Sequence, residues 1–413
     1  VSKVDGGTWY LSSTGNVWAN TAVRVGALRL LAPQALAPAA PVTMGQGGTE
    51  TAILDLGGFT QRIGRLLLNS TGGTKVIGNG GTNAATLVIA GNATSSYAAV
   101  IADSVLGGTN VTGLVVENAA NVTLNGANTF SGPTLVSNAW LRYQTAGTLA
   151  RTPITVVESG VFEVDSSGGN RTLSNNLSGA GLLLKSSANN FVTRGSNTFS
   201  GTIRATAGYL VFDHIDADNG VPSLDLSGGN LALPEMFNTN DCTVGSLSGT
   251  AASVIDPNYN SGTQTTGPRV LAVYQSSNAT FAGAIKIGSG GRDISLRKQG
   301  NAVLTLSGTN TYGGPTFVSN GTLLVQGSLA TGLITVAAAG TLGGTGLLGG
   351  SVVCEGVLAP GASAGKLLIL GSYTQAPGGT LAIEIGGATA GTTHDWLDVS
   401  GSATIDGALS VTL

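Results

Sequence analysis

Apolar and polar residues alternate along this chain in short stretches, which is the pattern of half-buried β-strands. Clear examples are residues 52–56, 85–89, 121–124 and 303–306. Clusters of Gly, Asn, Ser and Thr separate these stretches, and such clusters favour turns. The pattern therefore predicts strands of about four to six residues joined by short turns.

Helical periodicity is almost absent from the sequence. The best candidate, residues 28–39, contains Pro33 and Pro38, and a proline inside a helix costs about 3 kcal/mol. We therefore expect strand, turn and loop in this segment, and an all-β protein.

One segment recurs with little change. Residues 128–138 read NTFSGPTLVSN and residues 310–320 read NTYGGPTFVSN. A weaker copy, NTFSGTI, begins at Asn197. The spacings from Asn128 to Asn197 and from Asn128 to Asn310 are both close to multiples of about 23 residues, a size typical of one solenoid coil.

The repeat and the strand pattern together predict the architecture. Leucine-rich and helical repeats need helix-forming segments, which are missing here. Short strands with Gly and Asn turns instead favour a right-handed parallel β-helix, with apolar side chains inside. We expect one continuous β-solenoid over residues 1–413, with about 18 coils, least regular between residues 213 and 300.

Composition and charge exclude several classes of protein. The chain has 65 Gly in 413 residues, and 18 Lys and Arg face 21 Asp and Glu. This balance lacks the excess of cations that binding to nucleic-acid phosphates requires. No apolar run approaches the roughly 20 residues of a membrane-spanning helix. We therefore expect neither a nucleic-acid partner nor a membrane-spanning segment.

The cysteine count and the first residues bear on the compartment. Cys242 and Cys354 are compatible with one disulfide, an intermolecular link or two buried thiols, and the last is favoured. The chain begins at Val1 without a charged and then apolar leader. We expect an exported protein whose signal was removed or lies outside this sequence.

Residues 305–325 resemble the autotransporter-associated β-strand repeat of bacterial autotransporter passengers. Residues 54–64 are similar to the family's segment between repeats, and residues 358–363 and 395–399 to its C-terminal coils. The resemblance implies an exported β-helix at the cell surface. The family's translocator barrel does not occur in this sequence, which stops at Leu413. We therefore expect either that the barrel was cleaved away or that the protein belongs to a branch of the family without a barrel. The resemblance implies little about molecular activity, because such passengers include adhesins, proteases, esterases and inert stalks.

Two glycine-containing motifs match catalytic or cofactor patterns. Residues 361–365, GASAG, place Ser363 as in a nucleophile elbow, with His394 and Asp395 downstream, but a strand is expected to follow. Residues 344–349, GTGLLG, match a dinucleotide-binding spacing without the helix that would bind a pyrophosphate. We interpret both as turns of the solenoid, and we expect no cofactor.

Acidic residues suggest two further sites. Asp213, Asp216 and Asp218 could offer oxygen ligands to Ca²⁺, but their spacing is not that of a known calcium loop, and we interpret the segment as a polar loop. A polysaccharide-degrading enzyme would need acids and bases that converge on one groove. Its candidate residues are Asp225, Glu235, Asp241, Asp256, Arg292, Arg297 and Lys298.

The aromatic residues have two interpretations. They could stack on sugar rings, or they could belong to the interior, as we expect for Phe130 and Tyr312 of the repeat. We favour the interior. The other aromatic residues considered are Trp9, Tyr10, Trp18, Trp140, Tyr143 and Trp396.

The two ends of a β-helix expose unpaired strand edges, which natural proteins usually cover. Neither end of this chain shows a capping helix. We therefore expect copies to stack end to end, as an open filament contact. The residues predicted for this assembly interface are Thr8, Trp9, Tyr10 and Leu11 at one end, and Leu409, Val411 and Leu413 at the other.

The sequence thus predicts a non-enzymatic, extracellular structural or adhesive protein of the cell surface, which self-associates into a filament. One alternative is a monomeric rod-like adhesin that binds carbohydrate or a host surface. A long loop or an exposed row of aromatic residues would favour it. The second alternative is the polysaccharide-degrading β-helix enzyme.

Overall fold

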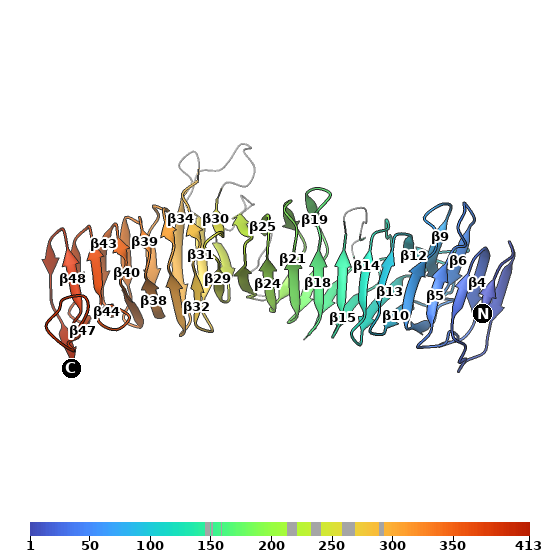
Figure 1. Cartoon of the computed structure of the whole chain (residues 1–413), viewed down its shortest axis with the longest axis horizontal. Coiled ribbons are helices and arrows are strands. Elements are labelled where there is room, and N and C mark those ends of the chain that lie inside the picture. Colours follow the sequence, from blue (N-terminus) through green and yellow to red (C-terminus); the bar gives the residue numbers. More distant parts are fainter. Residues whose placement is uncertain are drawn as a thin grey trace. The chain divides into compact units, whose positions relative to one another are not determined.

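The computed structural model describes residues 1–144, 149, 152–157, 159–212, 221–232, 241–257, 269–288 and 293–413. In this part of the chain every regular element is a β-strand. The chain divides into two compact units, Val1–Thr202 and Ile203–Leu413. Within each unit, parallel strands lie side by side from one coil to the next (Figure 1). The predicted all-β parallel β-solenoid is confirmed.

The first unit is built from short strands. They are β1 (Ser2–Lys3), β2 (Thr8–Leu11), β3 (Thr21–Val23), β4 (Gly26–Leu30), β5 (Pro41–Met44), β6 (Ala52–Asp55), β7 (Thr60–Ile63), β8 (Arg65–Leu68), β9 (Lys75–Asn79), β10 (Ala85–Ala90), β11 (Thr94–Tyr97), β12 (Val100–Ser104), β13 (Thr112–Glu117), β14 (Asn121–Leu124), β15 (Thr134–Ser137), β16 (Trp140–Tyr143), β17 (Ile154–Val156), β18 (Val161–Val164), β19 (Arg171–Leu173), β20 (Leu177–Gly179), β21 (Leu182–Lys185), β22 (Phe191–Thr193) and β23 (Thr198–Phe199).

The second unit continues in the same style. Its strands are β24 (Thr202–Ala205), β25 (Tyr209–Phe212), β26 (Ser223–Leu226), β27 (Asn230–Ala232), β28 (Asp241–Val244), β29 (Leu247–Gly249), β30 (Val254–Asp256), β31 (Arg269–Tyr274), β32 (Ala279–Phe281), β33 (Ala284–Ile285), β34 (Ile294–Gln299), β35 (Val303–Leu306), β36 (Thr309–Asn310), β37 (Thr316–Val318), β38 (Gly321–Val325), β39 (Ser328–Leu329), β40 (Leu333–Val336), β41 (Gly340–Gly344), β42 (Leu347–Leu348), β43 (Ser351–Cys354), β44 (Val357–Pro360), β45 (Lys366–Ile369), β46 (Tyr373–Gln375), β47 (Thr380–Glu384), β48 (Trp396–Val399), β49 (Ala403–Thr404) and β50 (Ala408–Thr412).

The sheets run along each unit, across the coils. The first unit holds the rows β1-β3-β5-β8, β2-β4-β6-β9-β12, β7-β10-β13-β15-β17-β20-β23, β11-β14-β16-β18-β21 and β19-β22. In the second unit a coil visits three rows in turn, as β38, β39 and β40 do. Those rows are β24-β26-β29-β32-β35-β38-β41-β44-β47-β50, β36-β39-β42-β45-β48 and β28-β31-β34-β37-β40-β43-β46-β49, and β25-β27-β30-β33 forms a fourth.

The number of turns corrects the sequence estimate. The chain makes about 16 turns rather than about 18. Coil length varies widely, since the register pairs Thr341 with Val357 in a short coil but Gly249 with Phe281 in a much longer one. Only the strand positions must match between coils, so the loops that connect them are free to lengthen.

The interior is built from ladders of similar side chains. One leucine ladder in the second unit passes through six successive coils in strict register. Its first four members are fully buried and the fifth, Leu381, is 9% exposed. The four fully buried leucines are thereby covered by their neighbours above and below, which stabilises the fold by about 2 kcal/mol per side chain. The ladder consists of Leu304, Leu323, Leu342, Leu358, Leu381 and Leu409.

The recurring asparagine of the sequence repeat has the same structural role in all three copies. Its Oδ1 atom accepts a hydrogen bond from a backbone N–H in the preceding coil. The aromatic residue two positions later is buried in each copy, as predicted for Phe130 and Tyr312. The asparagine pairs are Asn128 with Ile101, Asn197 with Leu177 and Asn310 with Ile285, with N···O distances of 2.9, 3.0 and 3.0 Å.

Buried lysines bind backbone carbonyls at the ends of strands. The Nζ atom of Lys298 donates to the carbonyl oxygens of Gln299, Gly300 and Asn320 at 3.0, 2.9 and 2.9 Å. These oxygens replace the water that the ammonium group loses on burial. Burial nevertheless lowers the pKa of Lys298 to about 8. Lys3, Lys75 and Lys185 are also buried.

Replacing Asn310 by Ala should lower the free energy of unfolding by about 2 to 4 kcal/mol. The variant leaves the N–H of Ile285 and the carbonyls of Gly308 and Ser328 without this partner. Denaturant unfolding followed by circular dichroism measures the loss. The matched control is Thr309→Ala, at the exposed position beside it, which should change stability by less than about 0.5 kcal/mol. Equal effects of the two variants would contradict the prediction.

Raising the pH from about 8 to 9, below the range in which the thiol of Cys354 and the buried tyrosines titrate, should stabilise the folded protein. In this window the unfolded chain, with the ordinary lysine pKa of 10.5, holds a proton that folded Lys298 has already lost. Stability therefore rises with pH, by up to about 1.4 kcal/mol per pH unit for one group. Lys185 acts in the same direction, since burial lowers its pKa to about 8. Unfolding curves at several pH values measure the slope, and Lys298→Met should reduce it. A slope unchanged in that variant would disprove the assignment.

Candidate functional site

The edge of the first coil exposes large side chains. Strand β2 is the last strand of its row among the described residues and pairs with β4. Trp9 and Tyr10 are 41% and 65% exposed, Thr8 is exposed and Leu11 is partly exposed. The four residues predicted at this end therefore lie on an open edge. Whether they form an assembly interface stays a prediction.

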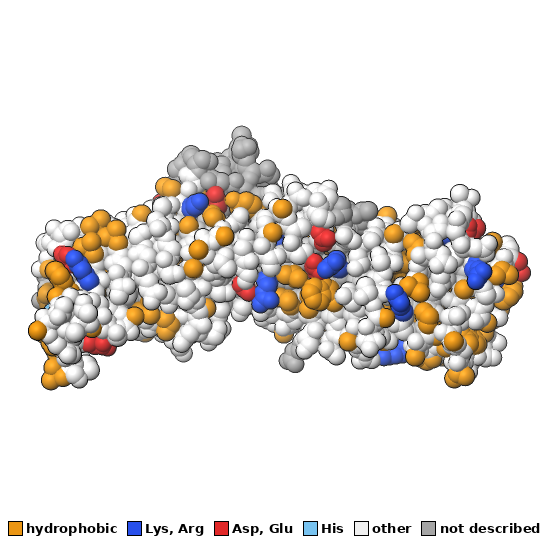
Figure 2. All heavy atoms as spheres, viewed as in Figure 1, with side chains coloured by type: hydrophobic (Ala, Val, Ile, Leu, Met, Phe, Trp, Pro, Cys, Tyr) orange, Lys and Arg blue, Asp and Glu red, His pale blue; other side chains and the backbone are white. Residues whose placement is uncertain are grey.

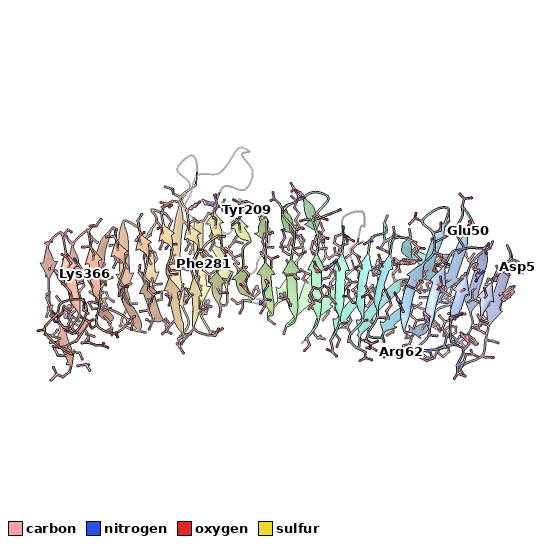
Figure 3. The ribbon with its side chains drawn as sticks, viewed as in Figure 1. Asp5, Glu50, Arg62, Tyr209, Phe281 and Lys366 are labelled. Carbon is pink, nitrogen blue, oxygen red and sulfur yellow. The ribbon has the colours of Figure 1, made fainter. Side chains whose placement is uncertain are left out.

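A polar cluster fixes this edge. The Nζ atom of buried Lys3 donates to the carbonyl oxygen and carboxylate of Asp5, and to the carbonyl of Val25 at 3.0 Å. The indole N–H of Trp9 donates to the other oxygen of Asp5 at 3.3 Å. The hydrogen bond from Lys3 lowers the pKa of Asp5. Asp5 lies at the end of the unit (Figure 3), so a fixed negative charge sits beside the exposed aromatic residues.

The last coil exposes positions that are interior everywhere else. Strands β48, β49 and β50 are each the last described strand of their rows. Leu409 is in register with buried Leu381, yet it is 65% exposed, and Val411 is 47% exposed. Leu413 and Ile405 are exposed as well. Core residues thus form an apolar surface at this end, and it includes all three predicted residues.

A cation packs on an aromatic ring beside this surface. Lys366 and Trp396 are register partners on β45 and β48. The Nζ atom of Lys366 lies 4.3 Å from the centre of the Trp396 ring and 2.8 Å from a carboxylate oxygen of Asp398. Figure 3 labels Lys366 among the last coils. The contact holds the exposed indole in one orientation.

The nucleophile-elbow residues form a structural turn. Both carboxylate oxygens of Asp395 accept backbone hydrogen bonds, from Gly365 at 2.9 Å and Glu384 at 2.7 Å. The Nδ1 atom of His394 contacts the carbonyl of Gly387 at 3.0 Å. Strand β45 follows Ser363, where an elbow would need a helix. Residues 344–349 comprise the end of β41, a two-residue corner, β42 and Gly349, without the helix that would bind a pyrophosphate.

The metal candidates and part of the acid-groove candidates are not among the described residues. Asp213, Asp216 and Asp218 lie outside the described residues, as do Glu235 and Arg292. Within the described ranges, no three His, Cys, Asp or Glu side chains gather as a metal site would require. Two other candidates have structural roles: the carboxylate of Asp225 lies 2.7 Å from Arg204, and Lys298 is buried.

The interior interpretation of the six other aromatic residues is wrong for most of them. Trp9, Tyr10 and Trp396 are exposed, and Trp18 and Trp140 are partly exposed. Only Tyr143 is buried. The tryptophans do not belong to the repeated motif, and this is why the buried positions of Phe130 and Tyr312 did not carry over to them.

The sequence indicated Trp140 but not the polar residues that surround it in a lateral cluster on the first unit. The carboxylate of Glu163 accepts hydrogen bonds from Trp140 Nε1 at 2.8 Å, Arg142 Nε at 2.6 Å and Ser186 Oγ at 2.6 Å. Hydrophobic side chains gather over β18 and β21, with charged side chains beside them (Figure 2). The rest of this face carries few charges. The sequence signal for this cluster is Trp140 and Arg142, which alternate with Leu141 and Tyr143 and therefore lie on the outer face of β16.

Comparisons with known proteins agree with the repeat. Residues 114–142 and 296–325 match the model of the passenger-associated-transport-repeat, and each match contains one copy of the recurring asparagine segment. The chain is 38% identical over 107 residues to the "Adhesin BmaC autotransporter" of Brucella suis biovar 1 (strain 1330), which is 25% of this chain and 3% of that protein. No solved structure matches the chain. The predicted resemblance to autotransporter passenger repeats is confirmed.

No helix among the described residues has the length and apolar character needed to cross a membrane. Cys242 and Cys354 are both buried, which favours two buried thiols among the three arrangements considered.

Native Cys354 should resist alkylation by iodoacetamide at pH 8. Burial raises the pKa of its thiol to about 11, and the reagent needs both access and the thiolate. Mass spectrometry should find two modified cysteines in denaturant, one in denatured Cys354→Ser, and an unmodified Cys354 in the native protein. Equal rates of labelling in the native and denatured states would contradict the buried position.

Proposed function

We propose that this chain is a structural segment of a bacterial surface protein with an adhesin-like role, exposed outside the cell and without enzymatic activity. The two passenger-associated-transport-repeats support this, as does the similarity to a protein named an autotransporter adhesin. The chain spans about 3% of that relative's length. The role of the whole protein is therefore part of the proposal.

We further propose that copies of the chain stack end to end, so that the last coil of one copy pairs with the first coil of the next. The observation that supports this is the exposure of Leu409, which is 65% exposed although its register partner Leu381 is buried. A strand of a second copy laid along β50 would cover Leu409 and Val411. It would also pair the backbone groups on the open side of β50, as in strand addition to any exposed sheet edge.

The other end offers a suitable counterpart. Trp9 and Tyr10 on β2 supply aromatic surface, and their burial against an apolar coil is favourable at about 25 cal/mol per Å². Each copy would present one apolar surface of each kind. Such a head-to-tail contact does not close on itself, so it produces a filament.

The enzyme alternative has weaker support. Among the described residues, two of the acids considered for catalysis have structural partners: Asp395 accepts backbone hydrogen bonds and Asp225 pairs with Arg204. A hydrolytic groove needs two carboxyl groups that face one substrate. The carbohydrate-binding alternative rests on a different surface, the lateral cluster.

Charges placed on the last coil should abolish assembly. In the double variant Leu409→Lys with Val411→Lys, stacking would bury two ammonium groups, which is strongly unfavourable. Sedimentation velocity and negative-stain electron microscopy should find filaments of the unaltered chain and single molecules of the variant. The matched control is Thr374→Lys, at an exposed position on β46, and it should assemble normally.

Two results would overturn this proposal. One is an unaltered chain that stays monomeric at its highest soluble concentration. The other is a double variant that assembles as well as the Thr374→Lys control, since the contact would then lie elsewhere on the molecule.

A further inference from the structure

The outer face of β14, β16, β18 and β21 differs from the rest of the solenoid surface. Two columns of outward side chains run across these strands in register. The residues between them, Leu141, Phe162 and Leu183, are buried, so the columns lie on the outer face, where Thr123 and Glu163 are covered by neighbouring side chains. The first column is Asn121, Trp140, Val161 and Leu182, and the second is Thr123, Arg142, Glu163 and Leu184.

A comparable column in the second unit has no such chemistry. It consists only of valine and threonine, at Val303, Thr322, Thr341, Val357 and Thr380. Stacking of coils alone is therefore satisfied by small β-branched residues. Coil stacking therefore does not explain Trp140 or the ion pair of Arg142 with Glu163 on the first unit.

The tryptophan of this face is held in place. Its indole N–H reaches across to β18 and donates to Glu163, which also accepts from Arg142. The Glu163 side chain is 4% exposed, whereas that of Arg142 is 39% exposed. The hydrogen bond lays the indole across the sheet before any ligand arrives. A ring fixed in this way loses little conformational entropy on binding.

Two further polar side chains lie along the same two coils, beyond Arg142 and Glu163. Gln144 donates to a carboxylate oxygen of Asp165 at 3.2 Å. Burial raises the pKa of Asp165, but hydrogen bonds from Ser167, Ser187 and Gln144 outweigh it, and the pKa lies below its ordinary value. Asp165 is thus ionised at neutral pH and accepts hydrogen bonds. Arginine, glutamine and carboxylate groups together offer both donors and acceptors.

We propose that this lateral cluster, formed by Trp140, Arg142, Gln144, Glu163 and Asp165, binds a neutral pyranose sugar of a glycan or polysaccharide. The apolar face of the sugar stacks on the indole of Trp140, since an aromatic face accepts the C–H groups of such a ring. The sugar hydroxyls bond to Arg142, Gln144 and Asp165. The proposal rests on the surface role proposed above and is independent of end-to-end assembly.

Charge selects the class of sugar. The cluster contains one arginine and two carboxylates. Arg142 is paired with Glu163, and the ammonium group of Lys185 interacts with Asp165. An acidic sugar would therefore meet two carboxylates and cations that already have a carboxylate partner, and it is disfavoured. A protein partner is disfavoured by size, because a stable interface covers about 800 Å² on each partner and this face has four partly exposed apolar side chains.

Binding of three oligosaccharides to the unaltered chain tests the proposal. Cellopentaose represents a glucan, lacto-N-neotetraose a neutral animal glycan, and trigalacturonic acid the acidic class. Saturation-transfer NMR identifies bound sugar protons, and calorimetry gives the affinity. At least one neutral probe should bind more tightly than trigalacturonic acid, and the preference between the two neutral probes identifies the source.

Variants locate the site. Trp140→Ala should weaken binding of the preferred neutral probe about tenfold, whereas Trp140→Phe, which retains a ring, should bind within about threefold of the unaltered chain. Trp396→Ala removes another exposed indole and is the matched control. It should bind normally, as should the double variant Leu409→Lys with Val411→Lys. Melting temperatures check that each variant folds.

Three results would overturn the proposal. They are the absence of binding by both neutral probes, equal binding by Trp140→Ala and the unaltered chain, and tighter binding of trigalacturonic acid. A loss of self-association in Trp140→Ala with unchanged sugar binding would identify the face as a protein interface instead. Normal sugar binding by a chain that fails to form filaments would refute the stacking proposal alone.

Discussion

Parallel pairing between successive coils is the interaction on which this structure depends. Every strand hydrogen-bonds to its equivalents in the neighbouring coils, so a residue at one position meets the residue at the same position one coil away. The ladder from Leu304 to Leu409 follows directly. Because only strand positions must match, one unit accommodates both short coils and coils with long connecting loops.

The same constraint governs the polar groups inside. A turn between strands leaves backbone donors and acceptors that no ladder satisfies, and water cannot reach them. Asn310 and its two counterparts accept from one such donor each, and Lys298 donates to three such carbonyls. Buried polar residues are therefore part of the folding pattern. Their polar atoms form hydrogen bonds with the backbone, so these atoms are not available for catalysis.

Surfaces that strand pairing between coils does not cover are the ones available for binding. Pairing along a coil axis has no internal limit, and so the last coil exposes Leu409 where the others bury a leucine. The lateral surface needs only solubility, which threonine, serine and asparagine provide. A fixed indole at Trp140 with an ion pair beside it departs from that background. Among the described residues, the lateral cluster is thus a place where the side chains are not explained by coil stacking.

The sequence by itself determined the strands, the parallel solenoid and the buried aromatic residues Phe130 and Tyr312, because each follows from a local pattern that repeats. The resemblance to autotransporter passenger repeats was also visible in the sequence alone. The number of turns depended on loop lengths, which no periodic pattern constrains. Only the tertiary structure brought Trp140, Glu163 and Ser186 together, since these residues belong to three successive coils and meet through the coil register.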